Sequence, residues 1–84
     1  MEKPKHRRNE IAIALLAKNI RELRKNKNLT IEQLAFKMEA DYSQLSRMER
    51  GKVNFTISIL FDVAIALQVR PAQLLENIDL HTEG

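Results

Sequence analysis

The sequence predicts an all-α domain, because apolar residues recur at helical spacing and capping residues stand at the ends of these patterns. In the middle of the chain, two neighbouring segments carry apolar side chains three or four residues apart, at Ile31, Leu34, Ala35 and Met38 and then at Leu45 and Met48. Helices this short are not stable alone in water, so they must pack on each other and on further helices.

Capping residues mark the ends of this central pair. Thr30 can cap the first helix with Gln33 as its reciprocal partner, and Asp41 can cap the second with Gln44 in the same way. Gly51 follows the second helix, where a left-handed residue commonly ends one. Two short helices joined by a tight turn have the layout of a helix-turn-helix, whose second helix is presented to the major groove of DNA. An ordinary helical hairpin in a bundle would show the same pattern.

A longer helix is expected ahead of this pair, over residues 10–27. Its apolar face is broad and consists of Ile11, Leu15, Leu16, Ile20 and Leu23. Asn28 tolerates a left-handed backbone and is expected to end this helix.

A fourth helix, over residues 56–67 with Thr56 as its N-cap, is unusually apolar. One stripe suffices for the core of so short a chain, and it is formed by Leu60, Val63, Ala64 and Leu67. A second stripe lies beside it, at Ile57, Phe61 and Ile65, and Ile78 could extend it. This second stripe indicates burial against another molecule, although cover by the first helix or by a fifth helix, at about 71–77, would also account for it.

Charge is distributed unevenly along the 84 residues. Residues 1–30 carry nine Lys or Arg and three acidic residues, whereas residues 61–84 carry one and four. A basic end favours attraction to a polyanion, although an ordinary charged surface would look similar. We expect residues 1–9 to be a basic flexible arm, either lying along DNA or solvated, residues 10–78 to form the DNA-binding and dimerisation domain, and residues 79–84 to be a frayed tail.

Composition excludes several classes of site. The chain has no cysteine, which excludes disulfides and thiolate metal sites, and its two histidines are solitary, so neither a metal nor a cofactor is expected. No nucleophile–base pair, phosphate loop or metal set indicates an enzyme. No apolar run approaches membrane-spanning length, and we expect a cytoplasmic protein.

One set of residues, within residues 19–75, matches a known family in order and spacing. The set consists of Ile20–Arg24, Leu29–Thr30, Gln33–Ala35, Leu45–Arg47, Glu49–Lys52, Asn54, Leu60, Val63–Ala64, Ala66–Leu67, Val69, Pro71 and Leu74–Leu75. On these residues the chain resembles the lambda-repressor/Cro-like helix-turn-helix family, also called the XRE family. The resemblance implies a compact five-helix domain that binds operator DNA, usually as a homodimer.

The recognition helix at 41–50, supported by the helix at 30–38, is expected to carry the base contacts. If Leu45 and Met48 face inward, the exposed side presents Tyr42, Ser43, Ser46 and Arg47. Arg47 can pair with guanine in a bidentate contact worth about 1–3 kcal/mol of discrimination, or it can contact a phosphate only. Phosphate contacts are expected beside the groove and at the helix starts, from Thr30, Gln44, Arg50, Lys52 and Asn54.

The resemblance implies two further features. An ion pair between Arg24 and Glu49 would tie the first helix to the recognition helix, and it would contribute much less if both side chains were exposed. A dimer contact through the fourth and fifth helices would involve Ile57, Phe61, Ile65 and Ile78.

Four residues depart from the family pattern. Glu39 and Gln68 stand where the family commonly has Gly, Ile31 replaces a common Gln, and Phe55 replaces a common Pro. In a left-handed turn, Glu39 would cost about 1–2 kcal/mol, unless the turn itself differs. These departures make it unsafe to transfer an operator sequence from the family.

The sequence therefore predicts a DNA-binding regulator of transcription rather than an enzyme. The expected form is a homodimer that reads a palindromic operator in double-stranded DNA. The alternative is a protein-interaction module or an antitoxin, whose main partner is another protein. The sequence does not distinguish a repressor from an activator, nor a phage repressor from an antitoxin or a restriction–modification controller.

Overall fold

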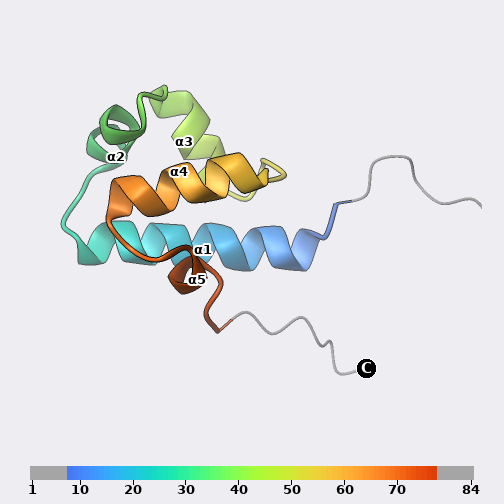
Figure 1. The fold of residues 1–84 in the computed structure, drawn as a ribbon. Helices are drawn as coiled ribbons and strands as arrows, with labels where there is room; N and C mark the ends of the chain where they lie inside the picture. Colours follow the sequence, from blue (N-terminus) through green and yellow to red (C-terminus); the bar gives the residue numbers. More distant parts are fainter. Residues whose placement is uncertain (1–7, 78–84) are drawn as a thin grey trace, which may run out of the picture.

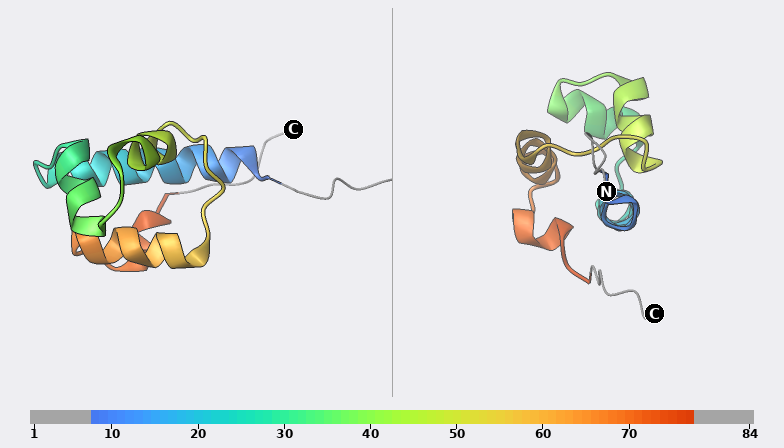
Figure 2. Two further views of the ribbon diagram at one scale, coloured as in Figure 1. Left: turned by 90° about the horizontal axis from the view of Figure 1, so that it is seen from above. Right: turned by 90° about the vertical axis from the view of Figure 1, so that its right-hand side faces the viewer.

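The computed structural model describes residues 8–77, which form five helices. In chain order these are α1 (Glu10–Asn26), α2 (Ile31–Met38), α3 (Tyr42–Glu49), α4 (Ile57–Leu67) and α5 (Pro71–Leu74). α4 runs alongside α1, with α2 and α3 on one side of these two helices and α5 on the other (Figure 1). The views in Figure 2 show the same arrangement from above and from one end. The all-α, five-helix fold is confirmed.

The core lies where the five helices meet. It is built from apolar side chains of every helix, and the largest fully buried ones are Ile20, Leu34, Leu45, Met48, Val63, Leu67 and Leu74. Burying one such side chain stabilises the fold by roughly 1.5–3 kcal/mol. In α2, α3 and α4, the fully buried positions are those that the helical periodicity predicted.

The first two turns of α1 bury a different face from the predicted one. Ile13 and Ala17 are buried, whereas Ile11 is 44% exposed. The run at residues 11–17 is apolar on nearly every side of the helix, so periodicity alone cannot select the inward face. The selection comes from tertiary packing, because Gly51, in the loop after α3, lies against Ile13.

Four helices end with the same backbone hydrogen-bond pattern. A left-handed residue stands one or two positions after each of these helix ends, and the four are Asn28 (φ 60°), Glu39 (φ 55°), Gly51 (φ 72°) and Gln68 (φ 60°). At the end of α3, the Gly51 N–H donates to the Met48 carbonyl at 3.1 Å and the Lys52 N–H donates to the Arg47 carbonyl at 2.9 Å, which is the Schellman arrangement. The left-handed ends predicted at Asn28 and Gly51 are confirmed. Glu39 and Gln68 adopt the same conformation without being glycine.

The caps of α2 and α4 are confirmed. The Thr30 hydroxyl accepts from the Gln33 N–H at 3.0 Å, and the Gln33 side-chain oxygen accepts from the Thr30 N–H at 2.8 Å. The Thr56 hydroxyl accepts from the Ile59 N–H at 3.1 Å.

α3 begins after Asp41 as predicted, but the predicted capping box there and the predicted end of α5 are wrong. Asp41 has the extended backbone of an N-cap, but its side chain is exposed to water and makes no cap hydrogen bond, so the predicted capping box with Gln44 is not formed. α5 ends at Leu74 rather than near residue 77. The Asn19 side chain of α1 donates to the Leu74 carbonyl at 2.8 Å and to the Glu76 carbonyl at 2.9 Å, which holds the chain in a turn after α5.

Candidate nucleic-acid interface

α3 presents a polar face to the surface because its apolar residues face the core. Leu45 and Met48 are fully buried against the core. On the outward side, Tyr42, Ser43 and Arg47 are exposed. The predicted base-contacting side of α3 therefore lies on the surface of the domain.

Ser46 and Gln44, the remaining predicted contact residues of this helix, are half-buried. Around the helix, Gln44 lies at an edge of the exposed side, whereas Ser46 lies between Tyr42 and Ser43. The face as a whole offers hydroxyl, amide and guanidinium groups, which are the groups that read base edges and phosphates.

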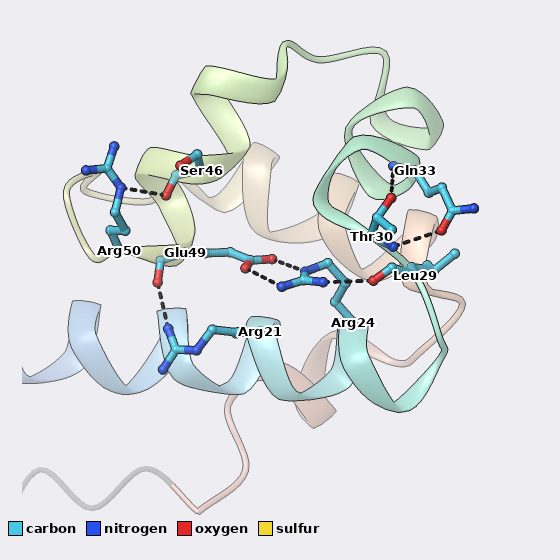
Figure 3. Close-up of polar contacts among 8 residues, drawn as sticks. All are labelled: Arg21, Arg24, Leu29, Thr30, Gln33, Ser46, Glu49 and Arg50. Atoms are coloured by element: carbon cyan, nitrogen blue, oxygen red, sulfur yellow. Dashed lines mark hydrogen bonds and ion pairs between the residues drawn. The ribbon is translucent and has the colours of Figure 1, made fainter.

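A buried ion pair fixes the C-terminal end of α3 to α1. Arg24 Nε lies 2.6 Å from Glu49 Oε2, and Arg24 Nη2 lies 2.9 Å from Glu49 Oε1 (Figure 3). Both side chains are almost completely buried, so the alternative of an exposed pair is wrong. Arg24 Nη1 also donates to the Leu29 carbonyl at 2.8 Å. One guanidinium thus connects α1, the recognition helix and the loop before α2.

A second arginine of α1 holds the same residue of α3. Arg21 Nη1 donates to the backbone carbonyl of Glu49 at 2.7 Å (Figure 3). The last carbonyls of a helix have no partner within the helix, so this bond satisfies one of them. Sequence reasoning did not find the role of Arg21, because no local pattern relates a charge in the middle of α1 to the end of α3.

The predicted phosphate-contacting residues are distributed around α2 and the end of α3. Arg50, Lys52 and Asn54 are exposed on and after the last turn of α3, and Arg50 Nε donates to the Ser46 carbonyl at 3.3 Å. Thr30 is exposed at the start of α2. Its N–H is already bonded to Gln33, so only its hydroxyl hydrogen remains as a donor to a phosphate.

The turn between α2 and α3 keeps a left-handed backbone. Glu39 has φ 55° and ψ 42° at this turn, which a residue with a side chain adopts at a cost of about 1–2 kcal/mol. The departure from glycine is therefore accommodated as backbone strain and does not change the turn. The orientation of α3 relative to α2 follows from this geometry.

The second stripe of α4 is exposed. Ile57, Phe61 and Ile65 are 68%, 48% and 72% exposed, so the alternative that α1 or α5 covers them is wrong. Leu75, directly after α5, is also exposed. Ile78, the fourth residue predicted for a dimer contact, lies outside the described residues.

Residues 8–77 contain neither a metal-binding cluster nor a helix that could cross a membrane. This part of the chain contains no group of three or more His, Cys, Asp or Glu side chains that could hold a metal ion. None of its helices is both long enough and apolar enough to cross a membrane.

Comparison with protein families identifies the domain. A family model described as helix-turn-helix matches residues 20–74, which include the second half of α1, all of α2, α3 and α4, and α5. The chain belongs to the XRE-type helix-turn-helix family. This is a family of DNA-binding regulators of transcription, and the predicted membership is confirmed.

Solved structures of helix-turn-helix regulators have the same fold. The restriction-modification controller protein C.AhdI from Aeromonas hydrophila is 34% identical, with 74% of this chain and 94% of that chain covered and a TM-score of 0.71. The hypothetical transcription factor NHTF from Neisseria is 35% identical, with 88% and 86% covered and a TM-score of 0.73. The clp gene regulator ClgR from C. glutamicum is 28% identical, with 76% and 83% covered and a TM-score of 0.74. A search of curated proteins found no match.

Proposed function

We propose that this helix-turn-helix protein is a homodimeric regulator of transcription that reads a palindromic operator. The observation that carries the proposal is the position of α3, whose polar side is exposed while two arginines of α1 hold its C-terminal end. A recognition helix must be held rigidly, since base contacts depend on well-placed hydrogen bonds.

In this proposal, Tyr42, Ser43, Ser46 and Arg47 contact base edges. Arg47 reads a guanine, because its planar guanidinium matches the two acceptors of that base in the major groove. Thr30, Gln44, Arg50, Lys52 and Asn54 contact phosphates and set the register of the helix on the duplex.

The dimer is proposed from the exposed apolar stripe of α4. Ile57, Phe61 and Ile65 are exposed on one side of this helix, and contiguous exposed apolar side chains mark interaction surfaces. A second copy packed through this stripe would present two recognition helices on one side of the DNA. Helix-turn-helix dimers read half-sites about one helical turn apart, or about 34 Å.

The deciding experiment is selection of bound sequences from random duplex DNA by the full chain. We expect a palindrome with half-sites about one turn apart, bound with an affinity that falls steeply as salt increases. If no sequence is enriched, operator reading is wrong. Sedimentation at micromolar concentration tests the dimer separately.

A second candidate function is a protein-interaction module or antitoxin. It is favoured by Phe36 on α2, which is 83% exposed and belongs to a different helix from the apolar stripe of α4. A protein that binds a different protein through these residues, and binds DNA weakly or not at all, would show no salt-sensitive sequence selection. The same selection experiment therefore distinguishes the two candidates.

A further inference from the structure

Four cationic side chains surround the last turn of α3 and the loop after it. We call Arg8, Arg21, Arg50 and Lys52 the α3-end cluster. They come from three parts of the chain, namely the residues before α1, the second half of α1, and the end of α3 with its loop.

Three arginines of this cluster donate to backbone carbonyls in α3 and in the loop that follows it. Arg50 Nε donates to Ser46 at 3.3 Å, Arg21 Nη1 to Glu49 at 2.7 Å, and Arg8 Nη2 to Gly51 at 3.5 Å. These bonds bring together cations that lie up to 42 positions apart in the sequence. The C-terminal end of a helix also carries partial negative charge, which favours cations there.

The charge of the cluster is only partly balanced within the described residues. Arg8 pairs with Glu10, with 2.9 Å between Nε and Oε2. The carboxylate of Glu49 is buried and is occupied by Arg24. Arg21, Arg50 and Lys52 have no carboxylate partner among residues 8–77.

Arg21 is held in place by one hydrogen bond and has further N–H donors that are not used in it. Its side chain is half-buried, and one N–H of its guanidinium is bonded to Glu49, whereas a guanidinium has five N–H donors. It shares a surface hollow with Arg50 and Gly51, and the small side chains of Ala14 and Ala17 line the same hollow. Because Arg21 lines this hollow and is only half-buried, it is open to an acceptor group from outside.

We infer that Arg21 and Arg8 bind the DNA backbone, together with Arg50 and Lys52. When the first residues of a recognition helix lie at base edges in the major groove, its last turn lies toward the sugar–phosphate backbone. A planar guanidinium binds phosphate oxygens through paired N–H groups. The inference rests on the proposed DNA-binding function and extends its phosphate-binding surface onto α1 and the residues that precede it.

Arg8 is the first residue that the structure describes, and its contact with Gly51 lies beside the end of α3. Lys3, Lys5 and Arg7 precede it in the sequence.

The test measures DNA affinity of the full chain between 50 and 200 mM salt, for the selected sequence and for random duplex. Arg21→Gln and Arg8→Gln each remove one charge and keep a polar side chain with an N–H donor. Each lost phosphate contact reduces the slope of log affinity against log salt by about 0.9. From 50 to 200 mM salt, wild-type affinity should therefore fall about 3–4-fold more than that of either variant.

Arg70→Gln is the matched control. It makes the same change in charge on an exposed residue just before α5, at the far end of α4 from the loop that follows α3. Its slope and affinity should equal those of wild type. Melting temperatures separate loss of a DNA contact from loss of the bond to α3, because a purely structural role would lower the melting temperature without changing the slope.

Each result bears on the cluster and on the proposed function separately. If Arg21→Gln and Arg8→Gln show the same salt dependence of affinity as wild type, and wild type still selects a sequence, the phosphate-binding role of the cluster is wrong and the proposed function stands. If the two variants show a weaker salt dependence on random duplex but wild type selects no sequence, the cluster binds phosphates and operator reading is wrong. Absence of DNA binding by wild type would overturn both. Ethylation interference gives a further check. Ethylation of the phosphate that Arg21 contacts should weaken binding by wild type but should not weaken binding by Arg21→Gln.

Discussion

α3 and α4 each bury one apolar stripe in the same core, but their outward faces have opposite chemistry. On α3, the outward residues Tyr42, Ser43 and Arg47 carry hydroxyl and guanidinium groups. On α4, the outward residues Ile57 and Phe61 are aliphatic and aromatic. A polar face suits the wet, hydrogen-bonding major groove, whereas an apolar face suits a dry contact with protein.

The two helices also differ in how they are held. α4 buries four apolar residues, Leu60, Val63, Ala64 and Leu67, whereas α3 buries only Leu45 and Met48 in addition to Glu49. The ion pair with Arg24 and the bond from Arg21 add to the small apolar contact of α3. In these two helices, the inward residues determine where the helix lies and the outward residues determine what it can bind.

The largest expected effect comes from breaking the outward face of α4. Phe61→Glu places a charge in the proposed dimer contact, so the protein should sediment as a monomer at micromolar concentration. Loss of the second recognition helix should weaken operator binding by roughly 10²–10⁴-fold, since linked sites gain about that much avidity.

Phe61→Leu is the control, because it keeps the surface apolar and should leave the dimer intact. A wild-type protein that sediments as a monomer would count directly against this interpretation of α4.

Breaking the inward anchor of α3 should have the next largest effect. Glu49→Gln leaves the Arg24 guanidinium buried without its counter-charge, which should lower the free energy of unfolding by about 3–5 kcal/mol. Urea unfolding followed by circular dichroism measures the change. Glu10→Gln removes the partner of Arg8 in an exposed pair and should lower the free energy of unfolding by less than about 1 kcal/mol. If both variants lose the same stability, the buried pair contributes no more than the exposed one.

The outward face of α3 is tested by Arg47→Ala. Loss of a bidentate contact should cost about 1–3 kcal/mol of binding and relax the preference at one base pair of each half-site. Repeating the sequence selection with the variant measures this directly. If all sequences weaken alike, Arg47 contacts a phosphate only.

The smallest expected effect concerns the turn that orients α3. Glu39→Gly relieves a left-handed backbone and should raise the free energy of unfolding by roughly 1 kcal/mol, because glycine adopts positive φ without steric cost. Lys37→Gly, two residues earlier and inside α2, should lower it by roughly 1 kcal/mol. Stabilisation by both substitutions, or by neither, would contradict the argument from backbone strain.

Most local features could be predicted because they depend on residues close together in the sequence. The cap at Thr30 and Gln33, the left-handed end at Gly51 and the buried position of Leu45 follow from capping chemistry and helical periodicity. Asp41 takes the N-cap position of α3 but makes no cap hydrogen bond, and spacing alone does not distinguish it from Thr30. Contacts of the predicted site residues with DNA stay predictions.

The sequence by itself therefore determined the helices, most of their ends, the stripe that each of α2, α3 and α4 buries and the family, since these are properties of short segments and of their order. Tertiary structure alone decided that α1 turns Ile13 rather than Ile11 inward, and that Arg8 and Arg21 meet at the end of α3. The physical reason is that an apolar run or a single charge has several possible partners along the chain. Only the packing of the helices brings one of them within contact distance.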